Sequence, residues 1–399
     1  MKDMDDLKNK SQAGRSLLIP VMTGFFVMGF VDIVGFANSY VQNDFPGLSN
    51  TLSSLISVSC FIWFLLLSVP VGILMNRVGR KKAVVWGLLL TALANIVPVI
   101  HYSFALVLVT FALIGMGNTL LQVSLNPLVT DIISSGRLTG TLTFGQFVKA
   151  VSSFLAPILA AAFSGGFLSW RMLLLLYAVF SLLSALFLVL SPVRNQKSPD
   201  AALSLMSPFR LLGKRRVLLF FIGIVILVGV DVGMGVTLPK LLMQRQGLEV
   251  TTAGMGNSVY FFARTLGTFL GAFILMRASE PRFYFLSSIL GLLGLLGLAF
   301  FSSMTLLFIS VALFGLGYAN LFAIIFSMTL KYVPDKANEA SALLITGVAG
   351  GGVVSPLLGL LVDATHTQTS AIWVLLLFWI VIVALSLTVK KTARPMDDR

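Results

Sequence analysis

Four ionisable side chains lie deep inside long apolar runs of this sequence, where charged residues are rare. They are Asp32, Lys149, Asp231 and Arg264. A charged side chain at the centre of a bilayer costs at least about 2.5–3.5 kcal/mol, so a functional or structural reason is needed to keep it there. A buried acid can bind and release a cation, and a base beside it can tune that exchange. The pattern therefore predicts a coupling site, buried ion pairs, or both.

The two acids and two bases balance in charge. One hypothesis is that they form two structural ion pairs, Asp32 with Lys149 and Asp231 with Arg264. The other is that at least one acid binds a coupling cation. We favour Asp32 for that role, with Lys149 tuning it, because the residues around Asp32 are small and polar. Lys240 is expected to extend its amino group to the membrane interface.

A row of amides interrupts the apolar stretch "LIGMGNTLLQVSLNPLVTDI". Asn118, Gln122 and Asn126 are spaced four residues apart, so on a helix they share one face. Unpartnered amides in hydrocarbon cost several kcal/mol, so this face should meet protein or water. Neutral donors and acceptors in a row suit a polyhydroxylated ligand. Hydrogen bonding between helices is the structural alternative.

Other polar side chains share helix faces with the deep charges. Gln146 lies three residues before Lys149, and Tyr260 lies four residues before Arg264. We therefore predict a substrate path between the two halves of the chain. Its predicted lining is Asn38, Asn118, Gln122, Asn126, Gln146, Asp231, Asn257, Tyr260, Arg264 and Asn320.

The composition indicates that a membrane surrounds these residues. Of 399 residues, 57% are hydrophobic and 11% are charged, whereas a soluble domain has roughly 25% charged residues. A membrane-spanning helix needs about 20 apolar residues, and twelve such runs predict an all-α membrane protein. The runs are 17–42, 52–75, 83–100, 104–130, 140–163, 168–190, 217–242, 253–276, 283–301, 304–330, 339–362 and 370–389.

The twelve runs divide into two related halves. "ALIGMG" from Ala112 returns as "ALFGLG" from Ala312, an offset of 200 residues, and Asp32 returns as Asp231 at an offset of 199. Parallel repeats of six helices are a transporter architecture. We predict two pseudo-symmetric six-helix bundles, residues 1–193 and 217–399, joined by a cytoplasmic linker at 194–216. The stretch "GVAGGGVVSP" is expected to be a closely packed part of the eleventh span.

The distribution of charge suggests an orientation. Lys and Arg gather in the two tails and the even-numbered junctions, while Arg171 and Arg245 are nearly all that the opposite side holds. Basic loops stay in the cytoplasm, so we expect a multi-pass protein of the bacterial inner membrane with both termini cytoplasmic. These loops account for the net charge of +13, and we expect no nucleic-acid partner. We also expect a monomer in the lipid bilayer.

Few features suggest enzymatic chemistry. Cys60 is the only cysteine, and neither His101 nor His366 has a partner at metal-ligand spacing. The sequence has no phosphate-binding loop, catalytic triad or HExxH motif. We therefore expect no metal, no cofactor and no enzyme activity.

The loop "GILMNRVGRKK" resembles the signature of the major facilitator superfamily, usually G-x-x-x-D-R-x-G-R followed by two basic residues. Gly72, Arg77, Gly79 and Arg80 match that pattern. Asn76 stands where Asp is usual, so the ion pair attributed to that Asp is not carried over. The resemblance implies that this loop takes part in conformational change.

Three further motifs, "QVSLNP", "TFGQF" and "ARTLGTFLGAFIL", resemble the fucose permease family of sugar:proton symporters. The resemblance implies an acid in the first span that takes part in proton coupling, and Asp32 matches it. It also implies a Glu where this chain has Gln122, which removes one of two expected carboxylates. Lys149 is a second departure, and it could favour a ligand with a carboxylate.

These observations predict cation-coupled uptake of a sugar or sugar derivative by alternating access. The coupling cation is expected to be a proton, with sodium as the alternative. Three other functions stay open: proton-coupled efflux of amphipathic compounds, an uncoupled facilitator, and a membrane sensor that does not transport.

Overall fold

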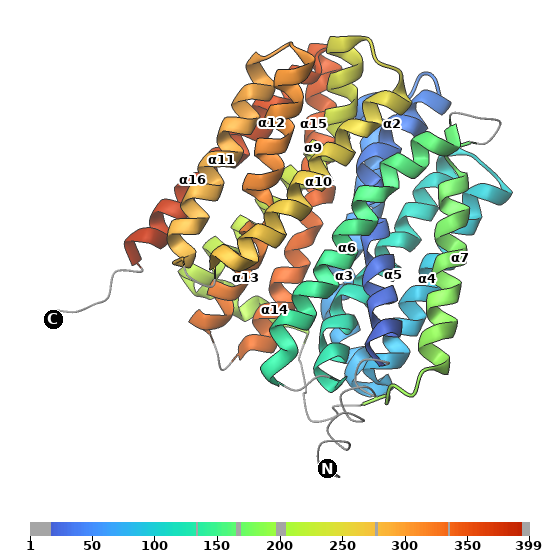
Figure 1. Cartoon of the computed structure of the whole chain (residues 1–399), viewed down its shortest axis with the longest axis vertical. Coiled ribbons are helices and arrows are strands. Elements are labelled where there is room, and N and C mark those ends of the chain that lie inside the picture. The colour runs from blue at the N-terminus through green and yellow to red at the C-terminus, as the bar shows by residue number, and fades with distance from the viewer. Residues whose placement is uncertain are drawn as a thin grey trace, which may run out of the picture.

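The protein is a bundle of roughly parallel helices (Figure 1), seen here in a computed structural model that describes residues 17–132, 135–164, 169–196, 205–275, 278–333 and 336–392. Within these ranges all regular secondary structure is helical. Twelve of the helical segments are long and apolar enough to cross a membrane, and their ends lie within four residues of the predicted ones. The predicted fold class is confirmed.

The helices of the first half begin with the span Leu17–Asp44, which contains the 3₁₀ segment η1 (Gly29–Ile33) and α2 (Val34–Asp44). The other helices of this half are α3 (Asn50–Val78), α4 (Arg80–Ile100), α5 (Phe104–Ile132), α6 (Ser135–Ser164) and α7 (Met172–Leu190).

Two short elements, α8 (Ser207–Arg210) and η2 (Leu211–Gly213), lie between the halves. The rest of the predicted linker 194–216 falls partly outside the described residues, so the domain boundaries stay a prediction. The helices of the second half are α9 (Arg215–Gln246), α10 (Val250–Leu275), α11 (Glu280–Phe300), α12 (Met304–Tyr318), α13 (Leu321–Tyr332), α14 (Ala337–Thr346), η4 (Gly347–Ala349), α15 (Gly350–Thr365) and α16 (Gln368–Thr392).

The two halves repeat not only in sequence but also in the way that equivalent helices pack. A Cβ atom added to Gly115 on α5 would lie 1.9 Å from the carbonyl oxygen of Cys60 on α3. One added to Gly315 on α12 would lie 2.8 Å from the carbonyl oxygen of Tyr260 on α10. Only glycine permits such close approach of two backbones. Each half therefore uses a glycine at the same place in its repeat to pack equivalent helices.

The two halves touch where their first spans cross. A Cβ added to Gly35 on α2 would lie 2.9 Å from the Cα of Gly235 on α9. These two glycines are 200 residues apart, the offset of the repeat. The pseudo-twofold axis therefore passes close to this crossing.

Among the described residues, three spans are interrupted. The first contains η1, the tenth is broken at Ala319 and Asn320 between α12 and α13, and the eleventh contains η4. Discontinuous helices in transporters commonly line the substrate site. The glycines after η4 are closely packed as predicted, since a Cβ on Gly350 would lie 2.0 Å from the carbonyl oxygen of Val225.

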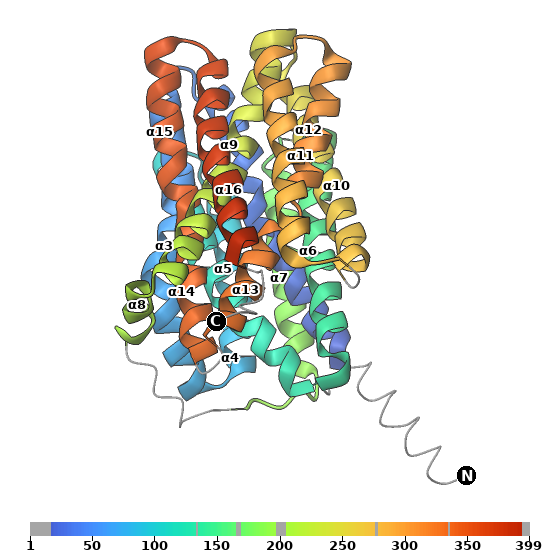
Figure 2. The same ribbon diagram turned by 90° about the vertical axis from the view of Figure 1, so that its left-hand side faces the viewer.

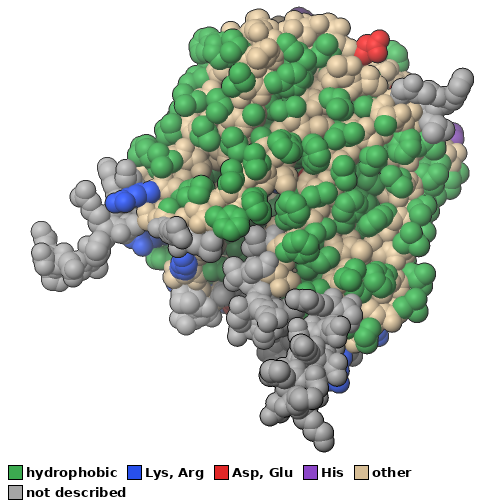
Figure 3. Space-filling model, viewed as in Figure 1, with side chains coloured by type: hydrophobic (Ala, Val, Ile, Leu, Met, Phe, Trp, Pro, Cys, Tyr) green, Lys and Arg blue, Asp and Glu red, His purple; other side chains and the backbone are tan. Residues whose placement is uncertain are grey.

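The two ends of the bundle differ. The flank in Figure 3 is covered by hydrophobic side chains, and Lys and Arg appear on that face toward the end where the described part of the chain begins, at Leu17, and stops, at Thr392. We call this the terminal end. The opposite end, where α15 turns into α16 (Figure 2), also carries the α2–α3 connection. We call it the tight end, because the contacts described below join the two halves there.

Candidate functional site

Asp32 lies on η1, where the first span departs from α-helical geometry. Its Oδ2 accepts a hydrogen bond of 2.6 Å from the Ser153 hydroxyl on α6. The three ion pairs found within the described ranges do not include Asp32 or Lys149. The hypothetical Asp32–Lys149 pair is therefore not formed in this conformation. The backbone of Lys149 is nevertheless close, with its carbonyl oxygen 3.1 Å from the Ser153 hydroxyl.

The second acid has a counter-charge, as the structural hypothesis predicted. Arg264 Nη1 donates to Oδ1 and Oδ2 of Asp231 at 3.0 and 2.9 Å. The Tyr260 hydroxyl also donates to Asp231. The side chains of Arg264 and Asp231 are 22% and 15% exposed. Because Asp231 compensates its charge, Arg264 offers little net positive charge to a ligand in this state.

Aromatic rings enclose this ion pair. The Arg264 guanidinium lies 5.0 Å from the centre of the Tyr318 ring, at cation–π distance. Phe314 lies 5.6 Å from Tyr260 and 5.0 Å from Trp379, between ring centres. Sequence reasoning missed Tyr318, although the repeat offset of 200 lays it on Asn118. Because Asn118 was a predicted site residue, its repeat partner Tyr318 could have been predicted as one too.

The two acids approach one another across the interface between the halves. Asp32 on η1 and Asp231 on α9 occupy equivalent places in the two spans that cross there. Each acid lies about one helical turn before the crossing of Gly35 and Gly235. Asp32, which has no ion-pair partner among the described residues, and the paired Asp231 therefore lie on the two sides of the same crossing.

Three of the predicted amides bond to main-chain carbonyls of neighbouring helices. The side-chain amides of Asn118, Asn257 and Asn320 donate to the carbonyl oxygens of Met28, Gly235 and Gly267, each at 2.8 Å. A fourth amide, Asn38, is fully buried and donates to the Ser53 carbonyl at 2.7 Å. These four side chains form hydrogen bonds between helices in this conformation, which for Asn118 is the alternative that the sequence left open.

The remaining predicted amides are more accessible. Gln122 donates to Asn118 Oδ1 at 2.8 Å and is half-buried. Asn126 is half-buried, and Gln146 is exposed. These three side chains keep polar atoms that a ligand could reach, so their role in substrate binding stays a prediction.

The signature loop connects helices within the first half. Gly79 has φ 98°, a conformation that favours glycine, and it separates α3 from α4. Arg80 forms an ion pair with Asp131 at the end of α5. Burial raises the pKa of Asp131 above its ordinary value, and the Arg80 guanidinium opposes that rise. Arg77 is exposed, and the side chain of Asn76 lies outside what the structure describes.

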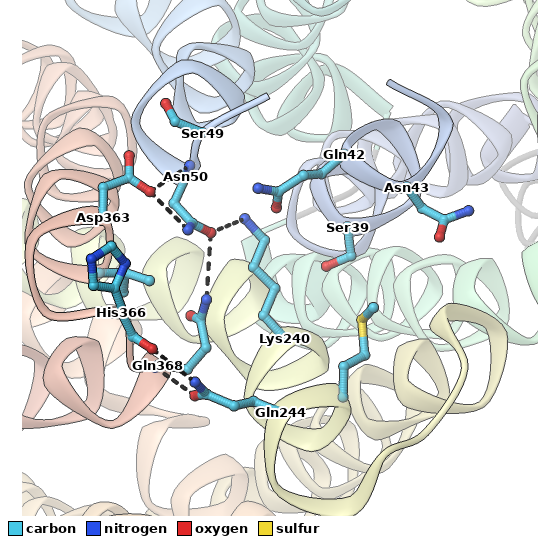
Figure 4. Close-up of a pocket in the computed structure, with 12 residues that line it drawn as sticks. Ser39, Gln42, Asn43, Ser49, Asn50, Lys240, Gln244, Asp363, His366 and Gln368 are labelled. Carbon is cyan, nitrogen blue, oxygen red and sulfur yellow. Dashed lines mark hydrogen bonds between the residues drawn. The ribbon is translucent and has the colours of Figure 1, made fainter. Parts of the chain in front are cut away.

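The tight end holds a cavity of about 820 Å³ (Figure 4). None of the predicted site residues lines it. Lys240 does, and it is only 8% exposed. Its amino group donates to Asn50 Oδ1 and Ser53 Oγ of α3, each at 3.2 Å. The expectation that Lys240 extends to the membrane interface is therefore wrong, because partners in the other half hold its ammonium group inside.

Asp363 at the end of α15 caps α3 across the interface between the halves. Its Oδ1 accepts from the backbone N–H and side-chain amide of Asn50, both at 2.9 Å. Its Oδ2 accepts from the backbone N–H and hydroxyl of Thr51 at 2.8 and 2.6 Å. A carboxylate is favoured at a helix N-terminus, where backbone N–H groups lack partners. Asp363, Asn50, Thr51 and Lys240 form what we call the tight-end lock.

Twelve spans in two repeated bundles, with interrupted helices and ionisable groups at the interface of the repeats, define a membrane transporter. The chain belongs to the Major Facilitator Superfamily, whose family profile matches residues 21–257 and 226–398.

Individual relatives agree with this assignment and are transporters rather than enzymes. The glucose/galactose transporter of Brucella abortus is 27% identical over 371 residues, which cover 85% of this chain and 86% of the relative. The structure of the nucleoside transporter NupG superposes with a TM-score of 0.76 at 15% identity, covering 96% of this chain and 100% of NupG. FucP in its outward conformation gives a TM-score of 0.68 at 19% identity, covering 93% and 97%. The two structural matches show the same fold.

Proposed function

We propose that the protein is a secondary active transporter that works by alternating access and couples uptake of a sugar or sugar derivative to a cation. The preferred coupling cation is a proton. One observation carries the coupling: Asp32 has no ion-pair partner among the described residues, yet it lies in the middle of a span. Binding a proton removes that charge from the low-dielectric interface. The sugar assignment rests on the similarity to a protein named a glucose/galactose transporter.

The orientation follows from the basic loops. We propose that the terminal end faces the bacterial cytoplasm and that the tight end faces outward. The tight-end lock then closes the outer side, and uptake requires it to open. The protein would work as a monomer in the inner membrane, since each chain carries both bundles.

The mechanism assigns different roles to the two halves. With Asp32 ionised, a charge without a counter-ion lies at the interface and opposes its closure around an empty site. A proton on Asp32 and a sugar hydrogen-bonded to Gln122, Asn126 and Gln146 allow the halves to close and rock. In the second half, Arg264 and the Tyr260 hydroxyl both donate hydrogen bonds to Asp231, so the charge of that acid stays compensated.

The test is sugar accumulation in proteoliposomes under an imposed pH gradient, with an imposed sodium gradient in parallel. Asp32→Asn should abolish accumulation of D-galactose or D-glucose and leave exchange of internal for external sugar in place. Asp44→Asn is the matched control, because it makes the same charge change in the same span while its partners, Tyr102 and Trp170, belong to the same half. Unchanged accumulation in Asp32→Asn would exclude Asp32 as the coupling residue.

An uncoupled facilitator is the second candidate, and Gln122 is the observation that favours it. Its amide, which cannot be ionised, stands where the fucose permease family carries a Glu, and it is bonded to Asn118. A facilitator equilibrates the sugar across the membrane and never concentrates it. Sugar uptake by the wild-type protein under a pH gradient therefore distinguishes the two functions. A symporter concentrates the sugar inside the proteoliposome, whereas a facilitator only equalises the two concentrations.

A further inference from the structure

The Ser153 hydroxyl on α6 has two acceptors within reach. Its Oγ lies 2.6 Å from Asp32 Oδ2 and 3.1 Å from the carbonyl oxygen of Lys149. A hydroxyl carries one hydrogen and can donate to one of them at a time. Ser153 is 2% exposed, so bulk water does not substitute for either partner. Which acceptor receives the hydrogen therefore depends on whether Asp32 carries a proton.

We propose that Ser153 is a positioning residue that changes its hydrogen-bond partner with the protonation state of Asp32; this inference rests on the proposed function of Asp32. When Asp32 is ionised, the Ser153 hydroxyl donates to Oδ2. When a proton from solution binds Oδ2, the new O–H of Asp32 donates to Ser153 Oγ. The Ser153 hydrogen then turns to the Lys149 carbonyl, and no covalent bond other than the new O–H changes.

The second acceptor links this switch to helix packing. The Lys149 carbonyl lies where α6 crosses the first span, since a Cβ on Gly29 would lie 2.6 Å from that oxygen. A serine that donates to the carbonyl four residues earlier bends its helix slightly. Protonation of Asp32 therefore alters the bonding of α6 at its contact with the first span.

Other ionisable groups face Asp32 from the surrounding helices, but they act at longer range. They are Cys60, Tyr177, Asp231, Arg264 and Tyr318. Within the described part of the chain, Ser153 is the side chain that donates a hydrogen bond to Asp32. Removing its hydroxyl changes the direct partner of the carboxylate and leaves the surrounding charges unaltered.

The experiment is an infrared pH titration of the purified full-length protein, in which the Asp32 carboxyl band is identified by its loss in Asp32→Asn. In Ser153→Ala the ionised carboxylate loses a charge-assisted donor, whereas the protonated acid loses a weaker, neutral acceptor. The midpoint of protonation should therefore rise by about 1 pH unit. Ser153→Thr keeps a hydroxyl and should keep the wild-type midpoint. Ser152→Ala is the matched control, because that neighbouring hydroxyl is buried and has no partner among the described residues.

A midpoint in Ser153→Ala within about 0.3 pH units of the wild type overturns the inference. If Ser153→Ala does not assemble, Ser153→Cys replaces it with the same expectation, because a thiol is a weak donor. The titration needs neither sugar nor gradient, so it separates the two hypotheses. Accumulation that survives in Asp32→Asn defeats the proposed function alone, whereas an unchanged midpoint defeats the role of Ser153 alone.

Discussion

Replacing Asp363 with Asn should open the tight end. The carboxylate accepts four hydrogen bonds from Asn50 and Thr51 in the other half. In Asp363→Asn the amide oxygen can still accept the two hydrogen bonds from one of these residues, but the amide nitrogen cannot accept the two from the other. The substitution also removes the negative charge at the N-terminus of α3. A partly buried charge at a helix terminus is worth up to about 2 kcal/mol.

When the halves separate, water replaces part of the lost hydrogen bonding. We therefore take about 2 kcal/mol as the total shift of the free-energy difference between the closed and open tight end. Because about 1.4 kcal/mol corresponds to a factor of ten, the ratio of open to closed protein rises about 30-fold. If the open state makes up about 1% of the unaltered protein, it becomes about one quarter in Asp363→Asn.

The assay is a pulsed electron paramagnetic resonance distance between spin labels on Asn43→Cys and Glu249→Cys. Both positions are exposed and lie near the tight end on opposite halves. Cys60 is the only cysteine, so one change, Cys60→Ala, clears the background. Asp363→Asn should add a population at longer distance, and Asp44→Asn, whose partners lie within one half, should not. Identical distance distributions with and without Asp363→Asn would refute the reasoning.

Two further predictions concern the interface and the ion pair. Gly35→Val places side-chain atoms against the Gly235 backbone, so the same distance measurement should show the tight end opened; an unchanged distribution would contradict the close crossing. Arg264→Met leaves Asp231 without its counter-charge, and breaking a buried pair costs about 3–5 kcal/mol, so the thermal unfolding temperature should fall. Adding Asp231→Asn to Arg264→Met should recover part of that loss, and no recovery would show that the pair is not the cause.

The membrane spans could be predicted from the sequence because hydrophobicity is local. A run of about 20 apolar residues needs no partner to be recognised, and the repeat at offsets of 199 and 200 indicated two equivalent bundles. The buried pair of Asp231 and Arg264 was also foreseeable. Two opposite charges in spans that are close in sequence are expected to find each other.

The amide stripe shows where local reasoning ends. Spacing correctly places Asn118, Gln122 and Asn126 on one helix, but it cannot tell a ligand from the carbonyl of a neighbouring helix. Asn118 bonds to the Met28 carbonyl just before η1, and that partner exists only because the first span packs beside α5. Lys240 was misjudged for the same reason, since its partners Asn50 and Ser53 lie in the other half.

The sequence by itself determined that the chain crosses a membrane twelve times, that its halves repeat, and which ionisable groups lie deep. Only the tertiary structure decided which of those groups pair, since Asp32 meets Ser153 on α6 while Asp231 meets Arg264. It alone revealed the tight-end lock, where Asp363 contacts Asn50 across 313 residues of chain. The physical reason is the length of chain on which each interaction depends. The free energy of transferring a span into lipid depends on that segment alone, whereas a hydrogen bond between the halves depends on how the two whole bundles pack together.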